Sequence, residues 1–409
     1  MGRFKVNGGR TLCGSVRVSG SKNAALPIIF ASLTTWGVSR FYNLPDIGDV
    51  RDALAIIKEF GAKVTVENCV TYVDTRSLSY TVPGRERVRR IRASTYLIGA
   101  CLARFERAEI LEFGGCAFSR RPIDMHIDAA IRFGAREDGD TLRCDKLKCA
   151  DITFRQKSVG ATVNALIMAA STEGESILRG CAVEPHISAL IAYLRGAGAR
   201  ISTKDDVITV VGTRLHGTVA TIPGDMIEAG TFLAAGIITD GRVRVSGFDG
   251  RELASFTAPL LSAGVVEDVS DGGIMLVGKP RREVSVITGA YPAFPTDLQP
   301  IFAPLLALAF GGSIEETVWK GRFGYLGELA KMGLSYSLDH NRARIYRSEI
   351  YGAEVKATDL RGGAAAVLVA LAAGGVSTVD NGELILRGYA SFEEKLRALG
   401  ADISYKEKY

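Results

Sequence analysis

The sequence predicts an α/β protein of two domains, each assembled from three similar modules. Three observations support this fold class. The chain has 409 residues, more than the roughly 100–200 of an ordinary domain. Its apolar share of 47% and charged share of 23% are typical of a globular protein and exclude a disordered chain. Finally, a pattern of helix, glycine and strand recurs six times along the chain.

Each repeat is a short amphipathic helix that ends at a glycine and is followed by a strand. A glycine directly after a helix adopts the left-handed conformation that closes the helix. The six glycines lie 64 to 73 residues apart and are Gly61, Gly134, Gly198, Gly264, Gly333 and Gly400. Helix–glycine–strand is common in α/β proteins, but this near-regular spacing favours a true repeat. Solenoid repeats are shorter, about 20–50 residues, so each unit is a module with several strands and helices.

Composition excludes several functional classes. The longest apolar run, Ala364 to Ala373, is far shorter than the ~20 residues of a membrane span, and the N-terminus has no apolar signal-peptide core. The seven cysteines are scattered without a Cys-x-x-Cys pair, which argues against a zinc site or a disulfide framework and favours the cytoplasm. The net charge of +5 suits anionic small substrates if positive side chains converge.

Two predicted helix starts could bind anions. Ser21 is a good N-cap before Lys22, and Ser158 plays the same part before Val159-Gly160 and a long apolar helix. The free N–H groups of a first helical turn favour an anion such as a diphosphate. Taken alone, an ordinary capped helix with a solvated lysine is the better interpretation at Lys22, and simple capping is the alternative at Ser158.

A cysteine stands in an electropositive, glycine-rich segment. Cys116 follows Gly114-Gly115 and precedes Arg120-Arg121. Nearby positive charge lowers a thiol pKa from about 8.5, which suits a nucleophile or proton donor. A buried structural cysteine is the alternative, but the two glycines predict a flexible, exposed loop and so favour function.

An acidic residue and several arginines complete the candidates. Thr296 is expected to cap a helix whose first turn holds Asp297, either as a general base or simply as a favourable charge at the helix start. Arginines also lie beside glycines or helix starts, where they can bind carboxylates or phosphates: Arg92, Arg361 and Arg387. The run Arg85 to Arg92 is expected to be mainly a solvated basic face. It lacks the interleaved aromatic residues of a nucleic-acid site.

Together and in this order, these motifs resemble the UDP-N-acetylglucosamine enolpyruvyl transferases, also called 1-carboxyvinyltransferases. The resemblance runs nearly end to end. It is carried by Ser-Gly-Ser-Lys-Asn-Ala-Ala-Leu around Lys22, Gly-Gly-Cys-Ala with Arg-Pro-Ile-Asp, Ser-Val-Gly-Ala-Thr from Ser158, and Tyr-Pro-Ala-Phe-Pro-Thr-Asp up to Asp297. A sister family makes 5-enolpyruvylshikimate 3-phosphate on the same architecture but is not expected to carry the Gly-Gly-Cys loop.

The resemblance implies a two-domain inside-out α/β barrel of six βαβαββ repeats, three per domain. The chain would start in one domain, complete the other and return. This gives a discontinuous domain of residues 1–20 and 228–409, and an inserted domain of residues 21–227. The implied reaction moves the enolpyruvyl group of phosphoenolpyruvate to the 3′-hydroxyl of UDP-N-acetylglucosamine and releases phosphate, the first committed step of peptidoglycan precursor synthesis.

The resemblance also implies a role for each site residue. Cys116 would protonate the methylene carbon and could be alkylated as a phospholactoyl adduct, and Asp297 would take the hydroxyl proton. Phosphoenolpyruvate would be held by Lys22, Arg121 and Arg387, with Arg92 and Arg361 close by. The sugar would contact Asn23 and Val318. The uridine end would be held by Arg121, Pro122, Ile123, Asp124 and Met125, and the diphosphate by Ser158, Val159 and Gly160. Neither a metal nor an organic cofactor is expected, and neither is a nucleic-acid or membrane partner. The protein should be a monomer or a weak oligomer.

Four positions depart from the family pattern and make this a divergent member. They are Arg120, Gln156, His186 and Leu386. The catalytic set survives these changes, whereas the nucleotide-contacting rim and the setting of Arg387 are less secure. Two alternatives therefore stay open: an enolpyruvyl transferase with another acceptor, and a non-catalytic or RNA-binding relative of the same fold.

Overall fold

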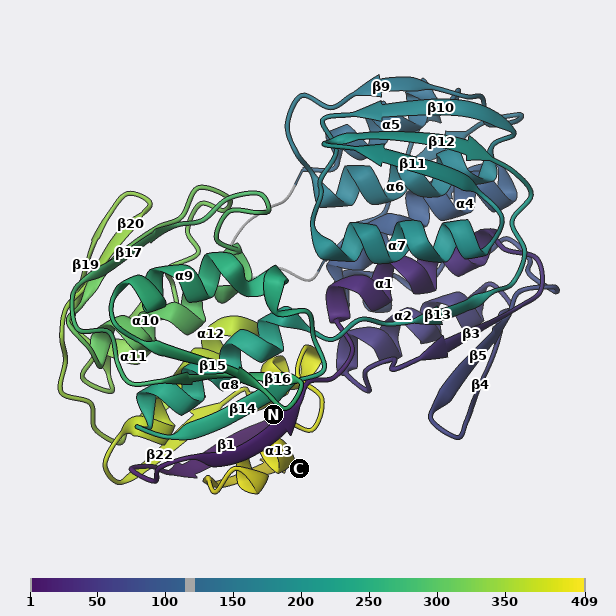
Figure 1. Ribbon diagram of the computed structural model, residues 1–409. Helices are drawn as coiled ribbons and strands as arrows, with labels where there is room; N and C mark the ends of the chain where they lie inside the picture. The colour runs from purple at the N-terminus through teal and green to yellow at the C-terminus, as the bar shows by residue number, and fades with distance from the viewer. Residues whose placement is uncertain (1, 115–121, 408–409) are drawn as a thin grey trace. The chain divides into compact units, whose positions relative to one another are not determined.

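The structure, a computed structural model, describes residues 2–114 and 122–407. The chain divides into two compact units. The first holds the chain up to Ser19 and from Gly224 onward, and the second holds the chain from Gly20 to Pro223. We refer to them as unit 1 and unit 2. Figure 1 shows that the N-terminal strand β1, in purple, lies beside the C-terminal part of the chain, in yellow.

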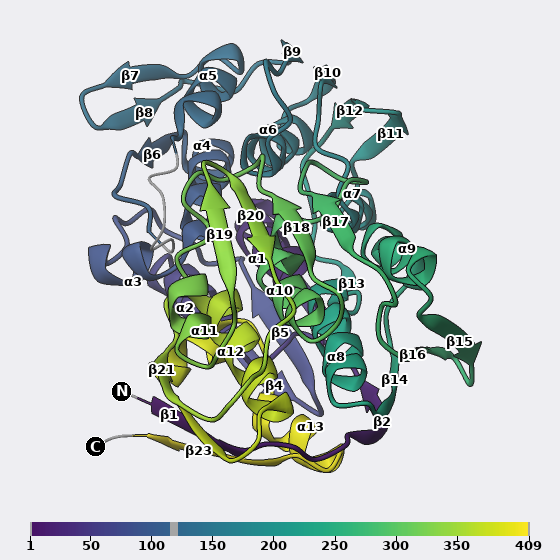
Figure 2. The same cartoon turned by 90° about the vertical axis from the view of Figure 1, so that its left-hand side faces the viewer.

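Unit 1 contains three mixed sheets in its described residues. They are β21-β22-β1-β23 (Glu354–Lys356, Val376–Asp380, Gly2–Asn7, Asp402–Glu407), β15-β16-β14-β2 (Val266–Ser270, Gly273–Val277, Arg242–Ser246, Cys13–Arg17) and β17-β18-β20-β19 (Val284–Ile287, Gly312–Glu315, Arg342–Ile345, Tyr336–Asp339). Figure 2 shows the last of these sheets in green. The helices of unit 1 are α8 (Met226–Ile238), η3 (Gly250–Leu253), α9 (Ala254–Ser262), η4 (Thr296–Leu298), α10 (Gln299–Ala307), α11 (Leu326–Ala330), α12 (Leu360–Ala372), η5 (Gly382–Arg387) and α13 (Phe392–Ala398).

Unit 2 also contains three sheets in its described residues. They are β13-β3-β5-β4 (Val219–Thr221, Val38–Tyr42, Val70–Asp74, Lys63–Glu67), β11-β12-β10-β9 (Arg200–Lys204, Val207–Gly212, Gly174–Arg179, Asp151–Thr153) and β6-β8-β7 (Arg107–Glu109, Thr141–Arg143, Arg136–Asp138). Its helices are α1 (Lys22–Ala31), η1 (Ser32–Thr34), α2 (Gly48–Glu59), α3 (Arg85–Arg90), η2 (Arg92–Tyr96), α4 (Leu97–Phe105), α5 (Asp124–Arg132), α6 (Val159–Ser171) and α7 (Pro185–Gly196).

The six predicted helix–glycine–strand repeats are confirmed. Each of the six glycines has a positive φ, between 93° and 118°, and stands two or three positions after the last residue of α2, α5, α7, α9, α11 or α13. A strand follows each glycine, namely β4, β7, β11, β15, β19 or β23. The same glycine turn therefore ends a helix and leads into a strand six times along the chain.

The core of each unit is made of helices that are apolar on all sides. In unit 1, α8, α10 and α12 pack on one another and are almost entirely buried. In unit 2, α1 and α6 are buried from Ala24 to Ala31 and from Ala161 to Ala170. A helix that is hydrophobic all round must lie inside a domain. Sheets therefore enclose central helices, as the predicted inside-out α/β barrel requires. No described helix is long and apolar enough to cross a membrane.

Candidate active site

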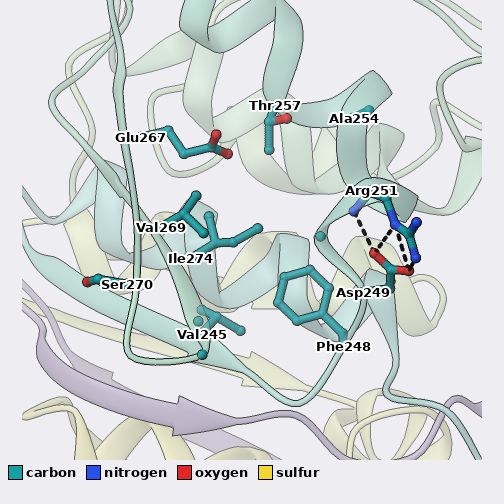
Figure 3. Close-up of a pocket in the computed structure, with 13 residues that line it drawn as sticks. Val245, Phe248, Asp249, Arg251, Ala254, Thr257, Glu267, Val269, Ser270 and Ile274 are labelled. Carbon is teal, nitrogen blue, oxygen red and sulfur yellow. Dashed lines mark hydrogen bonds and ion pairs between the residues drawn. The ribbon is translucent and has the colours of Figure 1, made fainter.

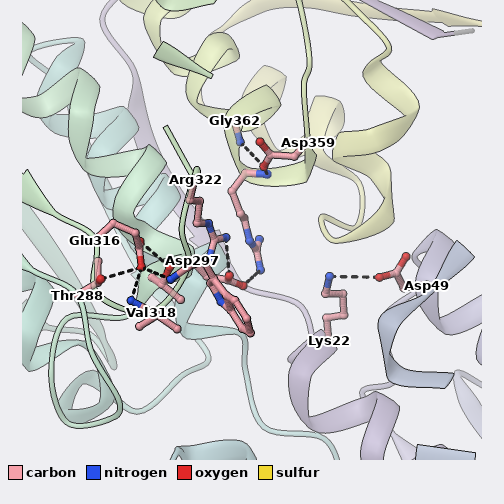
Figure 4. Close-up of polar contacts among 12 residues, drawn as sticks. Lys22, Asp49, Thr288, Asp297, Glu316, Val318, Arg322, Asp359 and Gly362 are labelled. Atoms are coloured by element: carbon pink, nitrogen blue, oxygen red, sulfur yellow. Dashed lines mark hydrogen bonds and ion pairs between the residues drawn. The ribbon is translucent and has the colours of Figure 1, made fainter. Parts of the chain in front are cut away.

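Asp297 lies between two buried arginines in unit 1 (Figure 4). Arg322 donates from Nη2 to Asp297 Oδ1 at 2.7 Å, and Arg361 donates from Nη2 to Asp297 Oδ2 at 3.4 Å. The arginine side chains are 5% and 3% exposed, whereas that of Asp297 is 29% exposed. The two guanidinium groups thus fix both carboxylate oxygens and leave the carboxylate within reach of a ligand.

The position predicted for Thr296 is wrong. It does not cap the helix, because η4 begins at Thr296 itself and Pro295 occupies the N-cap. The Thr296 hydroxyl instead donates to Glu316 Oε2 at 2.7 Å and accepts from Arg322 Nη1 at 2.7 Å. Asp297 does lie in the first turn, as predicted, and its carboxylate forms ion pairs with Arg322 and Arg361. The helix-dipole explanation of Asp297 is therefore the weaker one.

Arg361 is held at the start of α12. The N-cap Asp359 accepts from the backbone N–H groups of Arg361 and Gly362, each at 3.0 Å. The guanidinium lies over the Tyr389 ring, 5.0 Å from its centroid. Its Nη1 is buried and has no hydrogen-bond partner among the residues that the structure describes. A buried cationic donor without a partner is costly, and an anionic ligand would offset that cost.

Two further predicted residues, Arg387 and Val318, also belong to unit 1. Arg387 ends η5 and is half-buried. Val318 follows β18; it is 36% exposed and its backbone N–H donates to Glu316 Oε1 at 2.8 Å. The strands β17 and β18 are parallel, and Thr288 and Glu316 come directly after them. Functional residues in α/β proteins commonly lie at such carboxyl ends.

In unit 2, Lys22 opens α1 and pairs with a buried aspartate. Its Nζ lies 3.2 Å from Asp49 Oδ2, and Asp49 lies in the first turn of α2. Ser21 occupies the predicted N-cap, but its side chain makes no capping hydrogen bond. Asn23 follows Lys22 in the same first turn and is half-buried. This helix start therefore presents a lysine whose position is fixed by an ion pair.

The second predicted helix start is confirmed and is packed against a histidine. Ser158 Oγ accepts from Ala161 N at 3.3 Å and so caps α6. A Cβ placed on Gly160 would lie 2.7 Å from His126 Cε1, so only glycine fits there without a shift. Asn164 Nδ2 lies 2.7 Å from His126 Nδ1 and also donates to Thr95 O. Burial, with the charge of Arg92, lowers the pKa of His126 to about 4.

The residues predicted to hold a uridine surround the start of α5. Ile123 is the N-cap of this helix, Asp124 and Met125 begin it, and Pro122 precedes it. Arg92 Nη2 donates to Pro122 O at 3.3 Å. Asp124 forms an ion pair with Arg155. Its Oδ1 is buried and has no hydrogen-bond partner among the described residues.

Cys116, Arg120 and Arg121 lie outside the described residues. The neighbouring Gly114 is described, and it differs from the flexible loop glycine that was predicted. A Cβ at Gly114 would lie 1.6 Å from the carbonyl oxygen of Arg89, so the backbone here packs tightly against α3. Gly114 is therefore required for a close approach between two backbone segments.

The arginine run Arg85–Arg92 behaves as the predicted solvated basic face. Arg87 pairs with Glu59, Arg89 with Glu112, and Arg90 with Glu86 and Asp52. These arginine side chains are 47–55% exposed. Such exposed pairs contribute little to stability, and they involve three of the five arginines of the run, Arg87, Arg89 and Arg90.

Three of the departing positions are described. Gln156 is exposed. His186 lies in the first turn of α7. Leu386 packs, partly buried, against the hydrophobic core of unit 1, which explains an apolar residue at that position.

A hollow of about 550 Å³ lies elsewhere among the elements of unit 1 (Figure 3). Val245, Phe248 and Ile274 form its apolar floor, and Arg251 is paired with Asp249 at its edge. None of the residues predicted for the site lines it. This hollow is therefore not the candidate active site.

Sequence reasoning missed five buried polar residues of these sites: Asp49, Asn164, Thr288, Glu316 and Arg322. Only Glu316 carried a usable signal. It stands two residues after Ile314, at the end of a strand. Side chains at positions i and i+2 of a strand lie on the same face, so Glu316 is expected to be buried like Ile314. An acid on a buried face indicates a hydrogen-bonding role.

Comparison with known proteins identifies the family of this chain. Residues 6–396 match the family described as EPSP synthase (3-phosphoshikimate 1-carboxyvinyltransferase). The chain is 42% identical to UDP-N-acetylglucosamine 1-carboxyvinyltransferase 3 of Caldanaerobacter subterraneus subsp. tengcongensis, over 98% of this chain and 99% of the relative. It is 39% identical to UDP-N-acetylglucosamine 1-carboxyvinyltransferase of Halothermothrix orenii, with the same coverage.

Solved structures resemble the whole chain. The crystal structure of the enolpyruvyl transferase NikO from Streptomyces tendae matches with a TM-score of 0.89 at 28% identity, covering 100% of this chain and 99% of that one. EPSP synthase from Acinetobacter baumannii matches with a TM-score of 0.71 at 17% identity, covering 100% of both chains. The second likeness concerns the fold alone.

Proposed function

Since this chain belongs to the EPSP synthase family of 1-carboxyvinyltransferases, we propose that it transfers the enolpyruvyl group of phosphoenolpyruvate to the 3′-hydroxyl of UDP-N-acetylglucosamine. Phosphate is released, and the product is a peptidoglycan precursor. The observation that carries the proposal is the identity of 36–42% to proteins named for this activity, over 98–99% of the chain.

The same identities favour the nucleotide sugar as the acceptor. The two solved EPSP synthase structures are only 16–17% identical to this chain. Two enzymes of one fold that use different acceptors need different side chains around the acceptor. Such side chains differ more often between distant relatives than between close ones. The much closer likeness to UDP-N-acetylglucosamine transferases therefore supports the nucleotide sugar over shikimate 3-phosphate.

Asp297 is the proposed general base. A base must lie within hydrogen-bond reach of the hydroxyl proton that it removes. The Asp297 carboxylate is partly exposed, and Arg322 and Arg361 hold its two oxygens in one orientation.

Arginine and lysine side chains would bind the anionic groups of phosphoenolpyruvate. The buried Nη1 of Arg361, which lacks a partner among the described residues, can donate to a carboxylate or phosphate oxygen. Arg387, Arg121, Arg92 and Lys22 are proposed for the same anion. Convergent positive charge stabilises the negative charge that the phosphate leaving group takes with it.

The nucleotide end would use unit 2. The capped start of α6, with Ser158, Val159 and Gly160, presents backbone N–H groups that suit a diphosphate. Asp124 Oδ1, buried and without a partner among the described residues, can accept from a base N–H. Pro122, Ile123 and Met125 would pack against the uridine, while Asn23 and Val318 would contact the sugar.

Cys116 is proposed to protonate the methylene carbon of phosphoenolpyruvate as the 3′-oxygen bonds to C2. Phosphate then leaves C2, and the resulting methyl group loses one proton, which restores the methylene carbon of the enolpyruvyl ether. No organic cofactor or metal is expected for these steps. We place the reaction in the cytoplasm, in keeping with the six described cysteines, which are all free. A monomer or weak oligomer without a nucleic-acid partner remains our expectation.

The product of the reaction tests this proposal. Purified protein is incubated with phosphoenolpyruvate and UDP-N-acetylglucosamine, and the nucleotide product is identified by mass spectrometry and proton NMR. We expect an enolpyruvyl ether at the 3′-oxygen and one phosphate per ether. The 3′-deoxy analogue of the sugar nucleotide is the control and should give neither. An ether elsewhere on the sugar, or no ether from folded protein, would contradict the proposal.

A further inference from the structure

We propose that Glu316 is a positioning residue for this reaction. Its buried carboxylate fixes Thr296 and, through it, the arginine that holds Asp297, and it also fixes the backbone at Val318. The inference rests on the proposed function, because Asp297 and Val318 are its proposed base and sugar contact.

Glu316 is a carboxylate surrounded by hydrogen-bond donors. It is 1% exposed. Its Oε1 accepts from Thr288 Oγ1 at 2.9 Å, Val318 N at 2.8 Å and Trp319 N at 3.0 Å. Its Oε2 accepts from Thr296 Oγ1 at 2.7 Å. Figure 4 shows these contacts converging on one side chain.

Only a carboxylate satisfies this arrangement. An amide has one oxygen, so a glutamine here would point an N–H either at the Thr296 hydroxyl or at the backbone N–H groups. A buried carboxylate costs free energy unless its oxygens are fully hydrogen-bonded. The four donors meet that requirement, and the carboxylate in turn holds all four in place.

The first branch leads to the base. The Arg322 guanidinium can only donate, so Thr296 Oγ1 must accept from Arg322 Nη1 at 2.7 Å. The single hydroxyl hydrogen of Thr296 is then directed to Glu316. Arg322 Nη2 donates to Asp297 Oδ1 at 2.7 Å. Each hydrogen bond in the series Glu316–Thr296–Arg322–Asp297 therefore has one possible donor and one possible acceptor. Together these hydrogen bonds set the orientation of the Asp297 carboxylate.

The second branch leads to the sugar contact. Val318 and Trp319 donate their backbone N–H groups to the same Oε1 atom, so the chain after β18 turns around Glu316. Thr288 and Thr317 join β17 to this turn, because Thr317 N donates to Thr288 Oγ1 at 2.9 Å. One side chain thus links the position of the base to the position of the segment that carries Val318.

Turnover of four variants tests the first branch. Glu316→Gln keeps the volume but reverses one hydrogen bond, and its matched control is Glu315→Gln, the half-buried glutamate next to it. We expect Glu316→Gln to lower kcat at least about ten-fold, with the KM for phosphoenolpyruvate nearly unchanged. Thr296→Val should do the same, and Thr296→Ser, which keeps the hydroxyl, should restore most of the loss.

Double substitution tests whether Thr296 and Glu316 act on Asp297 through one another. If Thr296 and Glu316 act in series, the Thr296→Val/Glu316→Gln protein should be no slower than the slower single variant. If the fold-losses in kcat of the two single variants instead multiply in the double variant, Glu316 does not act through Thr296. A folded Glu316→Gln protein with the kcat of Glu315→Gln would overturn the proposal itself.

Hydrogen exchange tests the second branch without any need for activity. The backbone N–H groups of Val318 and Trp319 should exchange faster in Glu316→Gln than in Glu315→Gln, with equal melting temperatures as the check on folding. Equal exchange rates would overturn the inference. If the wild-type protein transfers no enolpyruvyl group, the proposed function fails, and the exchange rates still decide whether Glu316 fixes this segment.

Discussion

At the scale of single residues, Asp297 is the case in which the structure separates two explanations. An acid in a first helical turn is stabilised by the helix dipole, and that alone accounts for many such residues. Here each of the two carboxylate oxygens accepts a hydrogen bond from a buried arginine, Oδ1 from Arg322 and Oδ2 from Arg361. The two buried arginines therefore orient the Asp297 side chain.

The first prediction concerns this carboxylate. Asp297→Asn should lower kcat by about 10²–10⁴-fold, the usual contribution of a general base, because an amide cannot accept the hydroxyl proton. Binding of UDP-N-acetylglucosamine, measured by calorimetry, should remain within a few fold. Asp339→Asn, at an aspartate that is 90% exposed, is the control. Full turnover by Asp297→Asn would reduce Asp297 to a structural acid.

The second prediction concerns the cysteine of the glycine-rich segment. An epoxide phosphonate such as fosfomycin should alkylate Cys116, because Arg120 and Arg121 follow it closely in the sequence and nearby positive charge favours the thiolate. Intact-protein mass spectrometry should show one adduct on the wild-type protein and on Cys69→Ala, which removes an exposed cysteine. Cys116→Ala should show none. An adduct on Cys116→Ala would place the reactive thiol elsewhere.

The site residues were predictable to different degrees for physical reasons. Ser158 and Lys22 carry local signals, since capping and helix starts depend on neighbouring residues. Glu316 and Arg322 meet Thr296 from 20 and 26 residues away, and such pairings depend on how strands align. Thr296 was misplaced for the same reason, because its hydroxyl prefers a distant carboxylate to the nearest backbone N–H.

At the scale of elements, the repeated turn was the most predictable feature. A glycine after an amphipathic helix fixes both the end of the helix and the direction of the next strand, so the six repeats follow from local sequence. The order of strands in each sheet does not. The strand β1 pairs with both β22 and β23, more than 360 residues away, and nothing local encodes that choice.

The third prediction concerns the packing of α5 on α6. His126 is buried and its pKa is lowered to about 4 from 6.5. The unfolded chain therefore binds a proton that the folded chain does not, and stability is lost as pH falls from 6.5 to 4, by about 3 kcal/mol in total. His126→Asn, which keeps an acceptor for Asn164, should flatten the fall in urea midpoint over this range.

An exposed histidine provides the control for that experiment. His340 is 96% exposed, so His340→Asn should leave the pH dependence as it is in the wild-type protein. Burial raises the pKa of Glu228 to about 7, so this residue makes the folded state more stable as pH falls, opposite to His126. Its contribution is the same in the wild-type protein and in both variants. A His126→Asn protein with the wild-type slope would mean that His126 is not held neutral.

At the scale of the whole molecule, the chain passes twice between its two units, after Ser19 and after Pro223. The predicted domains, residues 1–20 with 228–409 and residues 21–227, stay a prediction, which unfolding measurements can test. The sequence offers a direct probe, because its two tryptophans, Trp36 and Trp319, belong to different units.

The fourth prediction uses these tryptophans. If the units are separate domains, Trp36→Phe and Trp319→Phe proteins should show urea transitions with different midpoints by fluorescence. Each variant reports the unit that keeps its tryptophan. Circular dichroism of the wild-type protein should cover both transitions. Coincident midpoints by all three probes would show a single cooperative unit and contradict the predicted domains.

The central claim concerns the reaction and its acceptor. Its most direct measurement is the initial rate of phosphate release from phosphoenolpyruvate, with UDP-N-acetylglucosamine and, in parallel, with shikimate 3-phosphate. We expect release with the nucleotide sugar alone. Release with shikimate 3-phosphate alone, or with neither acceptor from folded protein, would contradict the account.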